Sequence, residues 1–560
     1  MGQQKQQKTI SDPNQSNNAP NFWFCAGLLA ILLASILARD ITRPFYGLHS
    51  WADAHGPWAA RVHLKYGLRY TKGFSTRAVG YPPVEKPFRY LDHPQLPALL
   101  NAAAMAVLGI HNWSLRTVNV IATIITLLLF LKILRGLLDD KTAILAGLFF
   151  CLFPIIGYFG ANLWLYPFTL WAIWNYLVII KSLSNAPEPK KIHKIFLALS
   201  LFMMLQLAWE GFFFAMAIGI HYLCRCIHHR TLPEKSLLAI LIIAPLSSLT
   251  LDFIIMAAGH DWNYQKIIDL YKWRAGSGEM REHIWSDWFE KFWEFAVFNF
   301  TLPILITAIV YLTFGQLFVF MANTAKNTAS AISRRFPQFW LFFMPPVFQL
   351  FLLKGCLWRH QTWERPFCFP IAIAAALGVM LLGDILKKAN KYLAYAAMIT
   401  LVALFCIYCA IGTNFYYDIR WQSPAKIKMF EMLKQKIPPD KYLLSFEDFI
   451  VNQHPAKGAF YRPEIAWHLD RDIVVARTLE EIEQQAKTGK FPYYLIPATN
   501  YYNRKVADYL AGLIRQLQQR YKIDEYIPED LGETKDGKFY KASMTPYFIF
   551  DLTSKAGDSK

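Results

Sequence analysis

The sequence has few charged residues and, among them, few acids. Charged side chains make up 18% of the 560 residues, and 40 Asp and Glu stand against 58 Lys and Arg, so the formal net charge is +18. This low charged fraction, together with 54% hydrophobic residues, excludes an ordinary soluble globule. The Lys and Arg lie mostly in loops between apolar runs, which is the pattern of topology determinants. We therefore expect a lipid bilayer and no nucleic acid as partner.

Cysteine is also sparse, and its pattern indicates neither a disulfide framework nor a metal centre. None of the eight cysteines follows Cys409, and Cys224 and Cys226 have no second Cys or His pair at metal-ligand spacing. We interpret the cysteines as small buried hydrophobic residues. The sequence predicts no metal site. The cofactor is unknown, because a divalent metal is compatible with the sequence but not required by it.

Long apolar runs are abundant. Many reach the roughly 17–25 residues that cross a hydrocarbon core. About eleven crossings are expected, near 22–38, 115–135, 142–158, 163–181, 193–208, 211–226, 236–257, 296–320, 337–353, 366–386 and 391–413. Five basic loops between these runs face the cytoplasm under the positive-inside rule, which places every other loop on the far side.

The predicted fold class is a polytopic α-helical membrane protein with a small soluble domain. Residues 1–21 are polar and low in complexity, so we expect a disordered cytoplasmic N-terminus. Residues 22–415 form the transmembrane domain, and residues 39–96 are its first extracytoplasmic loop. In residues 416–560 short β-rich runs alternate with amphipathic ones, which predicts an extracytoplasmic α/β domain. The run "HPQLPALLNAAAMAVLGIHNW" is too short for a span and should be interfacial or re-entrant.

The first outer loop has an unusual distribution of charge. Its segment "YGLHSWADAHGPWAARVHLKYGLRYTKG" holds one carboxylate, Asp53, among aromatic and basic residues that include Arg61. Asp92 and His93 follow near the end of the same loop. Asp53 could equally cap, or form a salt bridge with, a helix over residues 54–66. Asp92 could cap the next helix, and His93 could fix the turn before its proline.

Two later outer segments add further polar candidates. Glu210 interrupts an almost continuous apolar stretch, and an acid so close to hydrocarbon costs up to about 2.5–3.5 kcal/mol on insertion scales. It is therefore either functional or a cap that pairs with an Arg. The loop "KGCLWRHQTWERP" supplies Arg359 and His360 directly after an apolar run. A solvated loop would explain these two residues almost as well.

Several of these segments resemble one family. "LHSWADAHGPWAARVHLKYGLRYTKG", followed some twenty residues later by "YLDHPQLPALL", resembles the first outer loop of the lipid-phosphate-dependent glycosyltransferases of the GT-C fold. These are the protein O-mannosyltransferase and aminoarabinose-transferase-like enzymes. "YFGANLWLYPFTLWAIW" and "LAWEGFFFA" are similar to later segments of the family, and the likeness covers about residues 22–385. The family commonly has Asp-Glu where this chain has Asp53-Ala54, and His-Pro-Pro where it has His93-Pro94-Gln95.

The resemblance implies transfer of a sugar from a polyprenyl-phosphate donor to an envelope acceptor, with inversion at the anomeric carbon. Asp53 would be the general base. Asp92 would position the acceptor or share a divalent ion, although the missing Glu beside Asp53 weakens the case for metal or acceptor binding there. His93, Arg61, Glu210, Arg359 and His360 would bind substrate, with Arg359 and His360 at the leaving phosphate.

The resemblance also implies a location. We expect a multi-pass protein of the cell membrane, a bacterial inner membrane, with the active site and the C-terminal domain extracytoplasmic. The main alternative is a transporter or flippase of lipid-linked or small polar substrates. Transporters often show internal repeats and broken helices that meet at the bilayer midplane, whereas here the unusual charges lie in outer loops and no repeat relates the two halves. A non-catalytic envelope scaffold is a second alternative.

Overall fold

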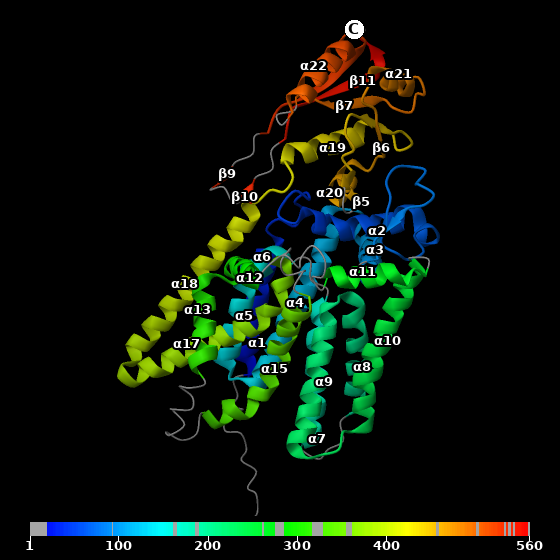
Figure 1. Ribbon diagram of the computed structural model, residues 1–560. Helices are drawn as coiled ribbons and strands as arrows, with labels where there is room; N and C mark the ends of the chain where they lie inside the picture. The colour runs from blue at the N-terminus through cyan, green and yellow to red at the C-terminus, as the bar shows by residue number, and fades with distance from the viewer. Residues whose placement is uncertain are drawn as a thin grey trace, which may run out of the picture.

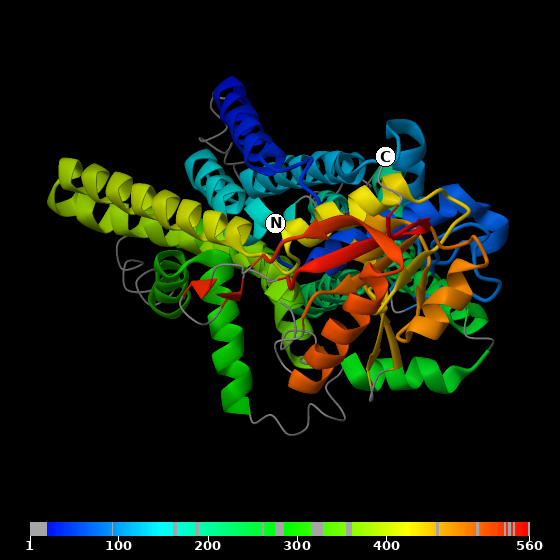
Figure 2. The same ribbon diagram turned by 90° about the horizontal axis from the view of Figure 1, so that it is seen from above.

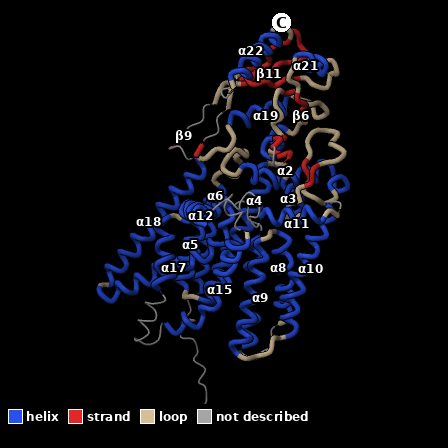
Figure 3. Tube along the Cα trace, in the orientation of Figure 1, coloured by secondary structure: helices blue, strands red, loops and turns tan. Residues whose placement is uncertain are grey.

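The structure is a computed structural model, and it describes residues 19–91, 93–160, 165–184, 190–259, 262–274, 285–315, 329–353, 361–454, 458–499, 503–530, 534–535, 539–540 and 544–557. These residues form a helix bundle and a C-terminal domain that holds most of the strands (Figures 1 and 3). We call the end of the bundle that carries this domain the domain side. Residues 1–18, most of the expected disordered N-terminus, lie outside the described residues.

Each expected span coincides with a helix of the bundle or with a broken pair. The helices are α1 (Ala19–Ala38), α4 (Asn112–Leu137), α5 (Asp140–Leu152), α6 (Pro154–Phe159), α7 (Leu165–Ser184), α8 (Lys191–Leu207), α9 (Glu210–His229), α10 (Lys235–Gly259), α12 (Trp285–Phe300), α13 (Leu302–Val310), α15 (Ala329–Leu352), α17 (Cys368–Ala389) and α18 (Lys391–Asp418). Among the described residues, six helices are long and apolar enough to cross a membrane. The chain is a multi-pass membrane protein.

Two expected spans are interrupted, and both breaks have a physical cause. The helix expected at 142–158 stops after Leu152 and restarts at Pro154, whose missing N–H and fixed φ suit the first position of a helix. The helix expected at 296–320 is bent by 107° between Phe300 and Leu302. Thr301 at this bend has a φ of 65°, and Pro303 is the second residue of the next helix, which begins at Leu302. Hydropathy alone gives length but not these breaks.

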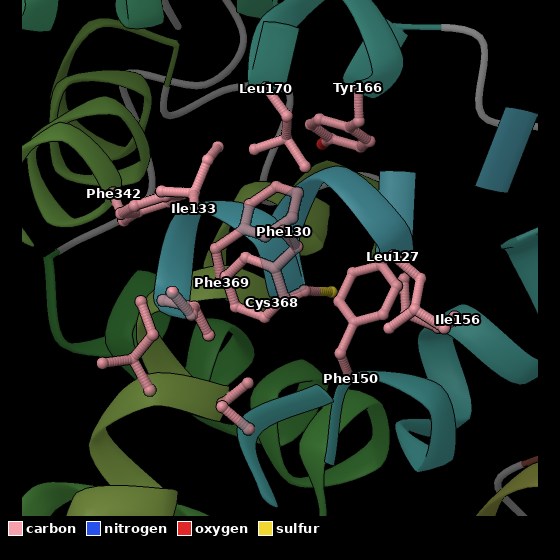
Figure 4. Packing of buried hydrophobic residues seen from close by; sticks show 14 of the residues in the cluster. Leu127, Phe130, Ile133, Phe150, Ile156, Tyr166, Leu170, Phe342, Cys368 and Phe369 are labelled. Carbon is pink, nitrogen blue, oxygen red and sulfur yellow. The ribbon is translucent and has the colours of Figure 1, made fainter. Parts of the chain in front are cut away.

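Aromatic side chains pack the centre of the bundle. Phe130 of α4, Phe150 of α5 and Phe369 of α17 lie against one another, with Phe369 5.2 Å from Phe130 and 5.6 Å from Phe150 between ring centroids (Figure 4). Phe342 of α15 joins them, 5.9 Å from Phe130. Between helices in lipid, close van der Waals packing of this kind drives association, because the tails are as apolar as the side chains.

A layer of polar and amphipathic helices separates the bundle from the C-terminal domain. It contains α2 (Ser50–Thr71), α3 (Leu96–Leu108) and the short hairpin of β1 (Thr76–Arg77) and β2 (Phe88–Arg89) (Figure 1). Helix α3 packs along α2. Helix α11 (Tyr264–Arg274) lies at the same level as this layer (Figure 1).

The C-terminal domain is the predicted α/β domain. Its sheet has the order β6-β3-β7-β11-β8, with β3 parallel to both β6 and β7, and β11 antiparallel to β7 and β8. These strands are β3 (Leu443–Ser445), β6 (Ile473–Val475), β7 (Tyr493–Pro497), β8 (Tyr521–Ile527) and β11 (Tyr547–Lys555). The short strands β4 (Val451–His454), β5 (Gly458–Tyr461), β9 (Thr534–Lys535) and β10 (Phe539–Tyr540) form two separate hairpins. Its helices are α19 (Pro424–Lys436), α20 (Pro463–Leu469), α21 (Leu479–Ala486) and α22 (Arg504–Gln518).

The two faces of the sheet have different partners. Helices α21 and α22 pack on one face, with Leu510 and Leu513 against Tyr494. The other face packs on α19 and α20, and this apolar cluster continues without a break into Phe45 and Trp58 of the layer below. Seen from above, the domain covers α2 while the α17–α18 pair extends away from it (Figure 2). The domain is therefore docked through a shared core.

Candidate active site at the domain side of the bundle

Asp53 lies in the first turn of α2. This helix begins at Ser50, after His49 in the left-handed conformation with φ of 54°, and the Asp53 N–H donates to the His49 carbonyl at 3.1 Å. The helix thus starts earlier than residue 54, and Asp53 is inside it and not its cap. A carboxylate in the first turn is favoured by the helix dipole.

Two arginines and a tyrosine lie within range of the charge of Asp53. Its charge acts on Arg43, which follows α1, and on Arg116 of α4. Arg43 Nη2 donates to the Tyr158 hydroxyl at 2.9 Å, and that hydroxyl donates in turn to the Leu48 carbonyl at 3.1 Å. Both Arg116 and Tyr158 are less than a tenth exposed. We call Asp53, Arg43, Arg116 and Tyr158 the Asp53 cluster.

Arg43 is enclosed by aromatic rings. Its guanidinium carbon lies 5.2 Å from the ring centre of Tyr158, 5.1 Å from that of Tyr417 and 5.7 Å from that of Tyr46. Burial lowers the pKa of Arg43, but interaction with Tyr158 and Asp53 outweighs it and raises the pKa above its ordinary value. The guanidinium is therefore a permanent positive charge.

Gly47 permits this close packing. A Cβ atom on Gly47 would lie 2.8 Å from Arg43 Nη2 and closer still to the Tyr158 hydroxyl. Any side chain there would have to displace both groups. The glycine is required by the close approach of the backbone to the Arg43–Tyr158 pair.

Arg116 holds the backbone that leads to the site. Its Nη1 donates to the carbonyl of Ile41 at 3.1 Å, that of Asp40 at 3.3 Å and that of Arg43. Its guanidinium carbon lies 4.8 Å from the ring centre of Phe45. The chain between α1 and α2 is thus wrapped around one buried cation.

The other predicted site residues divide into three groups. Asp92, Arg359 and His360 lie outside the described residues. His93 is half-buried in the outer loop, its ring 5.7 Å from that of Tyr90, and its carbonyl accepts from the Gln95 side chain at 2.6 Å. Arg61 and Glu210 are both buried and occupy two other places.

Arg61 is engaged with the C-terminal domain. Its guanidinium donates to the carbonyls of Trp467 at 2.7 Å and Ala466 at 2.8 Å, and lies 3.5 Å from the Asp470 carboxylate. It stands eight residues beyond Asp53 on α2, a rise of about 12 Å. These contacts give Arg61 a docking role in the structure and do not bring it to Asp53.

Glu210 pairs with an arginine, as one of the two interpretations of this residue expects. It begins α9, is 3% exposed and lies 3.3 Å from Arg365 Nη2. Glu364 directly precedes Arg365. It is fully buried in the 3-10 helix η4 (Gln361–Phe367). Glu364 accepts from Asn299 Nδ2 at 2.8 Å.

This buried polar chain reaches the Asp53 cluster through aromatic residues. The Tyr416 hydroxyl donates to Asn299 Oδ1 at 2.7 Å, and the Tyr416 ring lies 5.6 Å from that of Tyr158. Among the predicted residues that the structure describes, Glu210 and Asp53 therefore lie at two ends of one set of buried polar and aromatic side chains. Among the described residues, no group of three or more His, Cys, Asp and Glu is placed to hold a metal ion.

Sequence reasoning missed Arg43, Arg116, Tyr158 and Asn299, and it noted Glu364 as an outer-loop acid without predicting a site role for it. A signal existed for some of them, since a polar residue inside an apolar run carries a cost that marks it for attention. Asn299 lies near the end of α12 and interrupts an apolar run there in this way. Arg43 and Arg116 gave no such signal, because each lies at the edge of a span, where basic residues are ordinary.

Comparisons with known proteins address the fold. No protein-family model matches the chain, and no curated protein matches it by sequence. A solved structure of ArnT from Cupriavidus metallidurans bound to undecaprenyl phosphate is similar, with a TM-score of 0.56 and 9% identity over 97% of this chain and 99% of that one. The same protein in the apo state gives 0.53 at 9% identity, over 95% and 98%.

A second solved structure has the same architecture. The apo oligosaccharyltransferase of Archaeoglobus fulgidus is similar with a TM-score of 0.53 and 12% identity, over 91% of this chain and 74% of that one. Both neighbours are GT-C proteins, and the likeness runs through bundle and C-terminal domain together. The chain has the GT-C fold. The resemblance seen in residues 22–385 is thereby confirmed at the level of fold, although so little sequence is shared.

Proposed function

We propose that this GT-C chain is an integral membrane glycosyltransferase that uses a polyprenyl-phosphate-linked sugar donor. Asp53 is the general base, and transfer proceeds with inversion to an acceptor of the cell envelope. The observation that carries the proposal is the Asp53 cluster, one carboxylate whose charge acts on the half-buried Arg43 and the buried Arg116, with a tyrosine that Arg43 binds.

The chemistry of transfer needs a base and a cation. Asp53 accepts the proton of the acceptor hydroxyl or amine, whose lone pair then forms the new bond to the anomeric carbon. The bond from that carbon to the phosphate oxygen breaks, and the electron pair leaves with the polyprenyl phosphate. Arg43 and Arg116 supply fixed positive charge near the site. Arg359 and His360 remain our proposed phosphate ligands. Asp92 would position the acceptor or share a divalent ion, and His93 would contact the phosphate or the acceptor.

The donor explains the depth of the site. Each buried methylene group contributes about 0.8 kcal/mol to membrane binding, so a polyprenyl tail stays in the bilayer and presents its phosphate at the interface. We place the Asp53 cluster at that level, because Arg43 follows α1, Arg116 lies near the start of α4 and Asp53 lies in the first turn of α2. The solved ArnT neighbour is bound to undecaprenyl phosphate, which supports a lipid-phosphate donor here.

We place the Asp53 cluster and the C-terminal domain on the extracytoplasmic face of the cell membrane, a bacterial inner membrane. Supporting this, the turn between α17 and α18 carries Lys387, Lys388 and Lys391 and lies at the end of the bundle away from the domain (Figure 1). Basic residues at one end of a bundle favour the cytoplasm for that end.

The test uses Asp53→Asn in the full-length protein. Mass spectrometry of envelope glycans and lipids, with and without the chain, first identifies the transferred sugar. The purified variant is then assayed with that sugar on polyprenyl phosphate, and we expect transfer to fall about 10²–10⁴-fold. Asn has the size of Asp and lacks the basic carboxylate, so the helix start is retained.

A matched control is Asp287→Asn, an acid in the first turn of a different helix, α12, which should transfer at the wild-type rate. Full activity of correctly folded Asp53→Asn would exclude Asp53 as the base. Movement of the lipid-linked substrate across reconstituted vesicles, with no new glycosidic bond, would indicate a transporter or flippase instead.

A further inference from the structure

The chain that follows α18, including the C-terminal domain, forms hydrogen bonds with the short segment that joins α1 to α2. The Phe45 N–H donates to His468 Nε2 at 3.2 Å, across 423 residues of sequence. The Tyr46 carbonyl accepts from the Trp421 N–H at 2.9 Å. The next residue, Gly47, forms an isolated β-bridge with Arg420. Three consecutive residues between Arg43 and Asp53 are thus fixed by the chain that follows α18.

The hydrogen bond from the Phe45 N–H determines the protonation state and the tautomer of His468. Because Nε2 accepts a backbone N–H, it carries no proton, and the ring proton must be on Nδ1. Nδ1 then donates to the Glu431 carboxylate of α19 at 2.9 Å. His468 is 2% exposed. Both ring nitrogens of this buried neutral imidazole have hydrogen-bond partners, so the ring holds the Phe45 backbone N–H in a fixed position.

Phe45 connects this support to the Asp53 cluster. On one side its ring packs on Trp467 and His468, with centroids 5.7 and 5.9 Å away. On the other side it lies under the Arg116 guanidinium, 4.8 Å from its carbon. Arg116 acts on Asp53 and binds the carbonyl of Arg43. One buried path therefore runs from His468 through Phe45 and Arg116 to Asp53.

We propose that His468 is a positioning residue for the glycosyl-transfer site, acting through the Phe45 backbone to hold Arg43 and Arg116 around Asp53. This inference rests on the proposed function of Asp53. It gives the C-terminal domain a part in the reaction without placing any of its side chains on the substrate.

The alternative is that His468 only helps to dock the domain. Docking has a second support in the carboxylate of Asp470, which pairs with Lys65 at 3.1 Å and with Arg61 at 3.5 Å. Asp470→Asn therefore loosens docking without disturbing the path to Asp53. Comparing Asp470→Asn with His468→Leu separates docking from positioning.

The histidine also predicts a pH dependence. The charged groups that face it are Glu431 and Lys434 of α19 and Arg61 of α2. Burial is the largest influence and lowers the pKa of His468, Glu431 opposes it, and the two cations add to the lowering. The hydrogen bond from the Phe45 N–H to neutral His468 is fully present above the ordinary histidine pKa near 6.5. It is lost as pH falls toward the lower pKa of the folded state, because Nε2–H would then meet the Phe45 N–H.

The experiment measures transfer by full-length variants in nanodiscs at pH 7.5 and at several lower pH values. His468→Leu should lower kcat about 10–100-fold with little change in KM. His468→Gln keeps an acceptor for the Phe45 N–H, so it should recover most of the rate and lose the histidine-dependent fall at acid pH. Asp470→Asn should stay within a few-fold of wild type, as should His228→Leu, the same change at an exposed position of α9.

Hydrogen exchange of the peptide covering residues 43–49 provides a readout besides activity. It should rise in His468→Leu and not in His468→Gln. Equal loss of kcat in His468→Leu and Asp470→Asn, or unchanged exchange in His468→Leu, would overturn the positioning role. If Asp53→Asn is active, the proposed function has failed; if it is inactive while His468→Leu is fully active, only the present inference has failed.

Discussion

Arg43 and Tyr158 are 115 residues apart in the chain, yet their side chains share a 2.9 Å hydrogen bond. The bond is possible because Gly47, which has no side chain, passes directly over it. The absence of a side chain at Gly47 is thus a condition for the Arg43–Tyr158 contact. If Asp53 is the base that we propose, its action depends on the Arg43 cation and the Tyr158 hydroxyl being held in place.

Gly47→Ala tests this dependence. The added Cβ would lie 2.8 Å from Arg43 Nη2 and closer still to the Tyr158 hydroxyl, so both groups must move by several tenths of an ångström. A misplacement of about 1 Å in a catalytic group costs on the order of 10²-fold, and we expect transfer to fall about 10–100-fold. The measurement is kcat for the purified variant, with thermal unfolding as a control for folding.

Gly67→Ala is the matched comparison, because Gly67 in the bend of α2 has open space around its Cβ position and a φ of 82°. That change strains the backbone and should lower stability while leaving kcat near wild type. If Gly47→Ala transfers at the wild-type rate, the Arg43–Tyr158 pair does not matter to the reaction.

At the scale of elements, the periodicity of the sequence and its hydropathy predicted where helices lie. Every expected span has a helix, and the α/β pattern after residue 416 gave the sheet and α22. The bend at Thr301 and the break at Pro154 were not predicted, since a proline inside an apolar run permits either a kink or a new helix. Of the Asp53 cluster, only Asp53 itself was predicted from the sequence. The two arginines come from separate spans, and only folding brings them near it.

The contacts of Arg61 depend on the face of α2 on which it stands. It was expected to bind substrate, but it stands on the face of α2 that meets α20 and donates to two backbone carbonyls there. Arg61→Leu leaves those carbonyls and the Asp470 carboxylate without their buried partner. Removing one partner of a buried pair costs about 3–5 kcal/mol. We expect the C-terminal domain to become susceptible to limited proteolysis and the melting temperature to fall.

Arg69→Leu is the control, because Arg69 lies on the same helix and is exposed; its melting temperature should be close to that of wild type. A stable, protease-resistant Arg61→Leu protein with a raised KM would contradict docking and favour the original substrate-binding prediction.

At the scale of the whole molecule, the direction of the bundle decides whether the proposed chemistry has access to its donor. The C-terminal domain, α2 and the Asp53 cluster occupy one end, and the α17–α18 turn with its lysines occupies the other (Figure 1). The two ends of the bundle therefore differ: one carries the lysines of the α17–α18 turn and the other carries the C-terminal domain. Because α18 leads directly from the basic end to the domain, locating either end fixes the other.

Single cysteines at the two ends test this orientation. Thr488 is exposed on the C-terminal domain and Lys391 is exposed at the start of α18, and Cys224, which is exposed, is first replaced by Ser. A membrane-impermeant maleimide added to intact spheroplasts should label Thr488→Cys, and should label Lys391→Cys only after lysis. The positive charge next to α18 is the physical reason, since basic loops are retained on the cytoplasmic side. Labelling in the opposite order would place Asp53 at the cytoplasmic surface and exclude extracytoplasmic transfer, whereas the GT-C fold itself would stand.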